Sequence, residues 1–199
     1  MSKAKEHSIA IIGPVGSGKS TLTLALAERE KMNILSEPWE KNPYIPNLPE
    51  NVFSCQWLMY DLMMESHRKL RYNRRSILDR TFYEVFHIFT RQFKGYLTDQ
   101  EFEALRLRYD QLVPSVRVPD VTVYLKCHPQ VAYERTLQRG RDFEVQKYNL
   151  GYFQDQVFLY GGLAAYLEGL TTHLITVDAN ALQGQVLTET LRKLRAYER

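Results

Sequence analysis

The sequence lacks the features that mark secreted and membrane proteins. Its 199 residues include only two cysteines, Cys55 and Cys127, which lie far apart and form no CxxC pair. They predict reduced thiols in a cytoplasmic protein rather than a disulfide framework. No apolar run approaches the roughly 20 residues of a membrane-spanning helix. The apolar stretch near the N-terminus is short and leads into glycines, not into a cleavage site, which argues against a signal peptide.

A strong charge of one sign, internal repeats and metal-ligand spacings are missing too. Lys and Arg total 26 and Asp and Glu total 23, which gives a net charge of +3. This excess is too small to indicate nucleic acid as a partner, but it suits an enzyme that handles phosphates. The histidines show no metal-ligand spacing. With 44% hydrophobic and 25% charged residues, the composition predicts a single globular domain over residues 1–199.

What the sequence does contain is an alternation of short apolar runs with segments of helical length. The runs show no polar alternation, as expected for strands that are covered on both faces of a parallel sheet. Strand and helix alternating in this way predict an α/β fold with right-handed crossovers. The predicted strands are residues 8–12, 33–36, 76–78, 121–125 and 174–177. The predicted helices include residues 53–67, 82–93, 129–140 and 183–197, and one that Thr98 and Glu101 open as a capping box.

The most specific motif is a glycine-rich loop that follows the first predicted strand. It matches the pattern G-x-x-x-x-G-K-[ST] and opens a helical segment, as the motif requires. Glycines allow backbone N–H groups to surround a phosphate, and the helix N-terminus adds positive potential. Lys19 can reach the outer phosphates and Ser20 can ligate Mg²⁺, so the loop predicts binding of ATP with Mg²⁺. The predicted nucleotide-binding residues are Gly13, Gly16, Ser17, Gly18, Lys19, Ser20 and Thr21.

Acidic residues follow three of the four later strands, where an open α/β sheet binds its ligands. They are Glu37, Asp79 and Asp178. Each alone has a turn or a helix cap as its alternative, but together with the P-loop they favour a catalytic site. Glu37 is the candidate base for an acceptor hydroxyl, and Arg80 can hold that hydroxyl and the developing charge. Asp79 can hold Mg²⁺ together with Ser20, directly or through water.

Three arginines gather near the end of a predicted helix. Arg135 and Arg139 share a helix face, and Arg141 follows the glycine that ends the helix. Guanidinium groups bind phosphates well, so this cluster predicts a clamp on a triphosphate in a lid segment around residues 135–148. The alternative is a solvated basic helix end, which favours the helix dipole. The P-loop and the nearby Glu144 favour the clamp.

Together these motifs resemble the deoxynucleoside kinases of the P-loop superfamily. The resemblance rests on GPVGSGKST, EPWEKNPY, FSCQ, DRT and ERTLQRGRDFE, which span the chain from Gly13 to about Asp178. It implies a P-loop kinase three-layer sandwich, with a five-stranded parallel sheet flanked by helices. It also implies nucleoside salvage by an ATP-dependent transferase that phosphorylates the 5′-hydroxyl of a 2′-deoxyribonucleoside, and a homodimer joined through long helices.

The resemblance further implies roles for single residues. Two positions depart from the pattern of cytosine and purine kinases, because Met63 stands where many members have arginine and Val85 where many have aspartate. These apolar residues resemble the thymidine-accepting, broad-specificity branch, since a buried valine offers an exocyclic amino group no hydrogen bond. Plain core packing is the alternative for both. The implied acceptor-site residues are the base Glu37, its partner Arg80, Gln56 at the nucleobase edge, Phe89 stacked on the nucleobase, Glu144 at the 3′-hydroxyl and, less directly, Tyr44.

Other functions remain open at this point. A pyrimidine-leaning or broad preference is predicted, and a deoxyadenosine or deoxyguanosine kinase is the alternative. A nucleoside monophosphate kinase would share the P-loop and the lid, but its ionised acceptor needs no base such as Glu37. A non-catalytic binding protein should have lost Lys19, Glu37, Arg80 or the lid arginines, and all are present. The expected partners are therefore a small nucleoside and a nucleoside triphosphate, with no nucleic acid and no membrane.

Overall fold

Five parallel strands form one sheet in the computed structural model, which describes residues 7–70, 75–170 and 172–198. The spatial order is β2-β3-β1-β4-β5, so the chain crosses over between strands on both sides of β1. The predicted five-stranded parallel sheet is confirmed. The strands are β1 (Ser8–Ile12), β2 (Asn33–Leu35), β3 (Ser76–Asp79), β4 (Val121–Lys126) and β5 (His173–Asp178).

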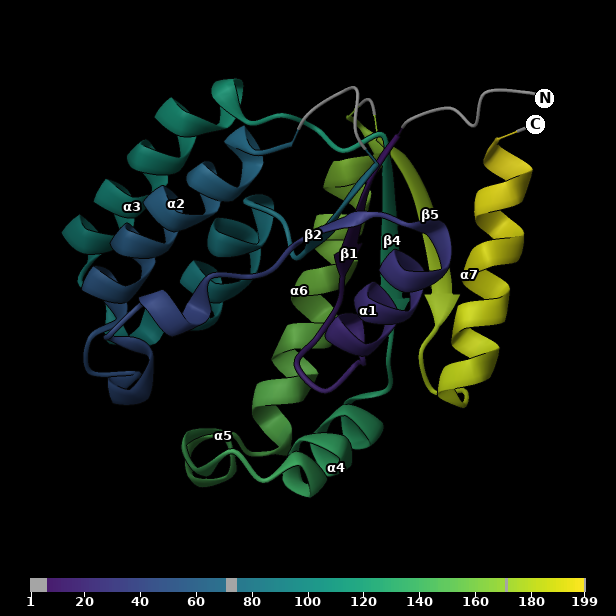
Figure 1. Ribbon diagram of the computed structural model, residues 1–199. Coiled ribbons are helices and arrows are strands. Elements are labelled where there is room, and N and C mark those ends of the chain that lie inside the picture. Colours follow the sequence, from purple (N-terminus) through teal and green to yellow (C-terminus); the bar gives the residue numbers. More distant parts are fainter. Residues whose placement is uncertain (1–6, 71–74, 171, 199) are drawn as a thin grey trace.

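Helices cover both faces of the sheet and complete three layers (Figure 1). α1 and α7 pack on one face, while α6 lies on the other with α2 and α3 packed beside it. α4 and α5 lie beyond the carboxyl ends of the strands (Figure 1). None of the helices in the described ranges combines the length and the apolarity needed to cross a bilayer. The helices are α1 (Lys19–Glu30), α2 (Val52–Arg68), α3 (Asp99–Leu112), α4 (Pro129–Arg139), α5 (Asp142–Lys147), α6 (Leu150–Glu168) and α7 (Gln183–Tyr197).

The central strand shows how the apolar runs build the core. In β1, Ile9 and Ile11 point into the cluster formed with α1 and α7, whereas Ile12 points into the cluster on the opposite face. The run therefore needs no polar residue, because both faces are covered. β2 departs from this expectation, since Asn33 and Ile34 are exposed. It is an edge strand that pairs only with β3.

The helix-end signals are confirmed where they were predicted. Thr98 Oγ1 accepts a hydrogen bond from the Glu101 N–H at 3.2 Å, and the Glu101 carboxylate accepts one from the Thr98 N–H at 2.9 Å. This reciprocal pair is the capping box that begins α3. Gly140 ends α4 with a φ of 68°, a left-handed conformation that glycine adopts without steric cost.

The apolar stripe over residues 82–93 winds differently from the predicted α-helix. Val85–Thr90 form a π-helix (η3), whose turns are wider than those of an α-helix. The hydroxyl of Thr90 donates to the Val85 carbonyl oxygen at 2.8 Å. Inserted π-turns are frequent at functional sites. Here the turn places Val85 and Phe89 in the wall of one cavity.

Candidate active site

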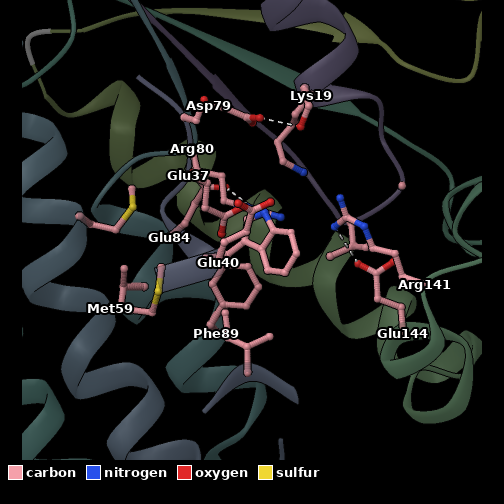
Figure 2. A pocket seen from close by; sticks show the side chains of 18 of the residues that line it. Lys19, Glu37, Glu40, Met59, Asp79, Arg80, Glu84, Phe89, Arg141 and Glu144 are labelled. Atoms are coloured by element: carbon pink, nitrogen blue, oxygen red, sulfur yellow. Dashed lines mark hydrogen bonds and ion pairs between the residues drawn. The ribbon is translucent and has the colours of Figure 1, made fainter. Parts of the chain in front are cut away.

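A cavity of about 460 Å³ opens at the carboxyl ends of β1, β2 and β3. Its walls come from the P-loop, the segment after β2, α2, the turn after β3 and the chain after α4 (Figure 2). Gly13 and Ser17 belong to the P-loop but do not line the cavity, and Arg135 lies outside it. Asp178 and Tyr44 do not line it either. The other predicted site residues converge there, and their chemical roles stay predictions. They are Gly16, Gly18, Lys19, Ser20, Thr21, Glu37, Gln56, Met63, Asp79, Arg80, Val85, Phe89, Arg139, Arg141 and Glu144.

The P-loop needs glycine at two turns of its backbone. Gly16 has a φ of 76°, and a Cβ atom there would lie 2.2 Å from the Ala132 carbonyl oxygen. Gly18 begins α1 with a φ of 90°. The next residue, Lys19, folds back into the loop, where its Nζ donates to the carbonyl oxygens of Gly13 and Pro14 at 2.8 Å each. Burial lowers the pKa of Lys19 to about 7, and the charge of Arg80 acts in the same direction.

Ser20 and Asp79 meet at the start of α1. Ser20 Oγ donates to Asp79 Oδ2 at 2.5 Å. The other carboxylate oxygen, Oδ1, is buried and has no hydrogen-bond partner in the described part of the chain. A buried oxygen of this kind suits a cation, and Mg²⁺ commonly takes one or two protein oxygens and completes its shell with water and phosphates. Within the described ranges, no group of three or more His, Cys, Asp or Glu residues is arranged so that it could hold a metal ion by itself. The pair therefore fits Mg²⁺ that is bound together with a nucleotide.

Glu37 and Arg80 lie next to each other in the cavity wall (Figure 2). Arg80 Nε donates to Glu37 Oε2 at 2.8 Å. The side chain of Glu37 is 21% exposed and that of Arg80 only 7%, so the carboxylate is the more accessible group. Arg80 has a φ of 76°, a left-handed backbone that is costly for a residue with a Cβ atom. Strain of this kind persists where the surroundings fix the residue, and it clusters at functional sites.

Another part of the cavity wall consists of apolar side chains and the side-chain amide of Gln56. Met63 and Val85 are both 2% exposed and line the cavity. Gln56 is also buried, and its Oε1 has no hydrogen-bond partner among the described residues. Leaving a buried acceptor without a donor costs about 1–3 kcal/mol. A ligand that presents an N–H group to Gln56 would remove this cost.

Two of the three predicted clamp arginines reach the cavity. Arg139 Nε and Nη2 both donate to Glu144 Oε2, the former at 3.1 Å. Arg141 Nη1 lies 3.6 Å from Glu144 Oε1, and its guanidinium stacks 4.8 Å from the ring centroid of Trp39. Their side chains are 37% and 40% exposed, so both can rearrange toward an incoming anion.

Arg135 of α4 and Asp178 at the end of β5 contact instead the loop that follows β5. Arg135 Nη1 donates to the Ala179 carbonyl oxygen at 2.6 Å. Asp178 Oδ1 accepts a hydrogen bond from the Asn180 N–H at 2.9 Å. Neither residue lines the cavity. Asp178 thus has the turn-capping role that was the alternative for each of the three acids, and the backbone carbonyl groups of the loop bind the predicted third clamp arginine.

The chain after α4 is also joined to the loop before α2. Lys147 Nζ donates to the carbonyl oxygens of Leu48 and Pro46, the latter at 3.3 Å. Leu48 lines the cavity. The segment that follows α4 and carries Arg141 is therefore tied to the cavity wall at Leu48 by a charged hydrogen bond.

Tyrosines other than Tyr44 occupy the cavity. Tyr44 lines a separate surface hollow that also includes Phe53 and Trp57. Tyr148 and Tyr152 line the main cavity, and their rings stack with centroids 3.8 Å apart. Tyr44 is therefore not placed to contact a ligand there. No sequence motif singles out the two tyrosines; Tyr148 is at the end of the predicted lid segment and Tyr152 follows it.

Two further residues were missed behind Arg80. Glu84 Oε1 accepts hydrogen bonds from Arg80 Nη1 at 2.9 Å and from the Tyr160 hydroxyl at 2.5 Å. Glu84 Oε2 accepts one from the Thr81 N–H at 2.6 Å. A sequence signal for Glu84 existed, because Thr81-x-x-Glu84 is a capping-box pattern. Nothing local in the sequence points to Tyr160.

The sequence is similar to those of known kinases. The sequence model of the family described as "Deoxynucleoside kinase" matches residues 9–190. A deoxyadenosine kinase of Dictyostelium discoideum is 25% identical, over 86% of this chain and 71% of its own length. A deoxyguanosine kinase of Bacillus subtilis (strain 168) is 27% identical, over 87% of this chain and 86% of its own.

Solved structures show the same fold. The deoxyadenosine kinase of M. mycoides with bound dATP superposes with a TM-score of 0.83 at 23% identity, covering 95% of this chain and 99% of that one. The likeness confirms the three-layer α/β architecture. Because the family match spans nearly all of the sheet and the cavity, the chain belongs to the deoxynucleoside kinase family and is a phosphotransferase.

Proposed function

We propose that this protein transfers the γ-phosphoryl group of ATP to the 5′-hydroxyl of a 2′-deoxyribonucleoside. The observation that carries the proposal is the Glu37–Arg80 pair, joined at 2.8 Å in a cavity that Lys19 also lines. A hydroxyl acceptor has a proton to lose and needs a base, which an accessible carboxylate provides. A monophosphate acceptor is already ionised and would need a cation at this position.

In the proposed reaction, Glu37 accepts the proton of the 5′-hydroxyl while the hydroxyl oxygen bonds to the γ-phosphorus. Glu37 Oε2 is engaged by Arg80 Nε, so Oε1 is the oxygen that takes the proton. The bond from the γ-phosphorus to the bridging oxygen breaks, and ADP leaves with the electron pair. Arg80 stabilises the charge that develops on the transferred group, in a site from which bound substrates exclude water.

The donor side of the cavity supplies positive charge. Lys19 exchanges the carbonyl oxygens of Gly13 and Pro14 for phosphate oxygens, and the phosphates favour its charged form. Arg139 and Arg141 exchange Glu144 for phosphate, with which guanidinium groups form bidentate hydrogen bonds. Mg²⁺ held by Ser20 and Asp79 would neutralise further phosphate charge.

We propose a base preference that leans towards pyrimidines or is broad. Support comes from Met63 and Val85, which line the cavity and offer no polar atom to an exocyclic amino group. Gln56 supplies an unpartnered acceptor for a ring N–H. A preference for deoxyadenosine or deoxyguanosine is the second candidate, because the relatives in Dictyostelium discoideum and Bacillus subtilis bear those names.

A substrate screen tests the proposal. Purified protein is incubated with ATP and Mg²⁺ and with each of the four deoxynucleosides, and separately with thymidylate. We expect 5′-monophosphates from the nucleosides, thymidine included. Phosphorylation of thymidylate alone would contradict the assignment. Rejection of thymidine, with deoxyadenosine or deoxyguanosine accepted, would support the second candidate.

The role of Glu37 is tested separately. Glu37→Gln is expected to lower kcat by about 10²–10⁴-fold, the usual contribution of a general base, while ATP binding is retained. The matched control is Glu40→Gln, which neutralises a second carboxylate in the lining of the same cavity. A near-normal rate of Glu37→Gln would remove Glu37 from the role of the base.

We also propose a homodimer in the cytoplasm. Phe158 on α6 is 81% exposed and Trp57 on α2 is 37% exposed, and large exposed apolar side chains are typical of an interface. Cys55 and Cys127 are both buried and free, as expected for a reducing compartment. Light scattering after gel filtration should give twice the mass of one chain, and Phe158→Asp should halve it.

A further inference from the structure

Arg80 lies between two carboxylates that differ in accessibility. Its Nε donates to Glu37, while its Nη1 donates to Glu84 at 2.9 Å and to the Tyr160 hydroxyl oxygen at 2.7 Å. The Tyr160 hydroxyl in turn donates to Glu84. The side chain of Glu84 is 1% exposed, against 21% for Glu37. One guanidinium thus joins a carboxylate that a ligand can meet to one that is almost wholly buried.

The contacts of Glu84 are those of a carboxylate anion. Its two oxygens accept hydrogen bonds from Arg80, from the Tyr160 hydroxyl and from both the N–H and the hydroxyl of Thr81. Burial raises the pKa of Glu84, and the charges of Arg80 and Lys19 oppose that effect. With every donor directed at its oxygens, Glu84 needs no proton of its own. The buried positive charge of Arg80 is therefore paired with the negative charge of Glu84, in addition to that of Glu37.

A capping role accounts for only half of these contacts. Glu84 stands three residues after Thr81 and binds its N–H through Oε2, as in a capping box. Thr98 and Glu101 form the same box at the exposed start of α3. At Glu84 the other oxygen, Oε1, binds a buried arginine and a buried tyrosine, and capping does not require these contacts.

We propose that Glu84 and Tyr160 are positioning residues that fix Arg80 beside Glu37 and share its positive charge, which leaves Glu37 basic enough to take the 5′-hydroxyl proton. The inference rests on the proposed function. A neighbouring cation lowers the proton affinity of a carboxylate, and a second anion on the same cation weakens that effect. A base with too low a proton affinity removes a hydroxyl proton poorly.

Several other charged or titratable groups face this network, and they stay in place when Glu84 is changed. A shift in pH dependence after that substitution is therefore attributable to Glu84. The groups are Lys19 of α1, Glu40 after β2, Asp79 of β3, Arg139 of α4, Tyr152 of α6, and Arg141, Glu144 and Tyr148 in the segment between α4 and α6.

The test is the pH profile of kcat for Glu84→Gln in the full-length protein, with saturating ATP, Mg²⁺ and nucleoside. Removing the Glu84 charge leaves Glu37 as the nearest counter-ion of Arg80. The acid limb should move to lower pH by about one unit, and the plateau of kcat should fall about tenfold, with KM for ATP within about twofold. Glutamine serves at this position of a capping box as well as glutamate does. A merely capping role therefore predicts an unmoved acid limb, and that result would overturn the proposal.

Two variants keep the test decisive if Glu84→Gln does not fold. Glu84→Asp retains the charge but shortens the side chain, so its acid limb should stay within about 0.3 unit of wild type while kcat falls at least about fivefold. Tyr160→Phe removes only the hydroxyl and should behave in the same way. A moved limb in either variant, or an unchanged kcat in both, contradicts the proposal.

The same assays separate this inference from the proposed function. An inactive wild-type protein, or an active Glu37→Gln variant, defeats the proposed function itself. An active wild type and an inactive Glu37→Gln variant, together with an unmoved acid limb in Glu84→Gln, defeat the inference alone.

Discussion

Nucleotide binding is expected to draw a proton from solution, because Lys19 is buried close to a second cation. Burial lowers the pKa of Lys19 to about 7, and the Arg80 charge lowers it as well, against opposing effects of Asp79, Glu84 and Glu37. Before a nucleotide binds, the Lys19 amine has two backbone carbonyl oxygens as partners. The phosphates of a bound nucleotide favour the ammonium form and return the pKa of Lys19 towards its ordinary range.

The size of the effect follows from the free-state value. With a pKa of about 7, Lys19 is about half protonated at pH 7, so binding takes up about 0.5 proton there. The uptake should rise to about 0.9 proton at pH 8 and fall to about 0.1 at pH 6. Calorimetric titration with ATP and Mg²⁺, in buffers with different ionisation enthalpies, measures this number directly. The slope of the apparent enthalpy against the buffer enthalpy is the count of protons.

Lys19→Arg is the matched control, because arginine keeps the charge and does not titrate in this range. Its uptake should be close to zero at every pH. A proton count that stays constant from pH 6 to 8, or that survives in Lys19→Arg, would refute the reasoning. The same pKa predicts a linked effect on stability. Because the pKa is about 7 in the folded protein and 10.5 in the unfolded chain, the unfolded chain binds more protons between these values, and the contribution of Lys19 to stability rises with pH there.

Three further substitutions test single contacts. Val85→Asp should lower the ratio of kcat/KM for thymidine to that for deoxycytidine at least about tenfold; an unchanged ratio would place Val85 outside the nucleobase site. Burial lowers the pKa of His67 to about 4. The unfolding free energy should therefore fall by up to about 1.4 kcal/mol per pH unit as the pH falls from 6.5 to about 4, and urea unfolding should find this slope reduced in His67→Asn. Thr98→Ala removes the cap of α3 and should cost about 1 kcal/mol without changing kcat; a lowered kcat would mean that this cap supports the active site.

The parts of the fold that the sequence predicted depend on local information. The central strands β1, β3 and β4 could be predicted because a run that is covered on both faces shows no polar alternation. The P-loop was found because its backbone turns demand glycine at fixed positions. Gln56, Asp79 and Arg80 line the cavity as expected because each stands at the end of a strand or on the inner face of a helix.

The remaining features depend on contacts between distant segments. Tyr160 reaches Glu84 across 76 positions in the sequence, and no local pattern encodes such a contact. Arg135 shares the pattern of the other clamp arginines, but the loop after β5 offers it backbone carbonyl groups as partners. The wide π-turn at 85–90 keeps the apolar spacing of an α-helix, so periodicity does not distinguish the two. Exposure of β2 follows from its place at the edge of the sheet, which is a property of topology.

The hydrogen bond from Lys147 to the carbonyl oxygen of Leu48 links two segments that line the same cavity. It joins the segment that follows α4, which carries Arg141, to a residue in the cavity wall, so we expect a movement of one to be transmitted to the other. If a bound nucleoside changes the affinity for the triphosphate by some factor, then the bound triphosphate changes the affinity for the nucleoside by the same factor. We therefore expect Lys147 to couple the binding affinities of the two substrates.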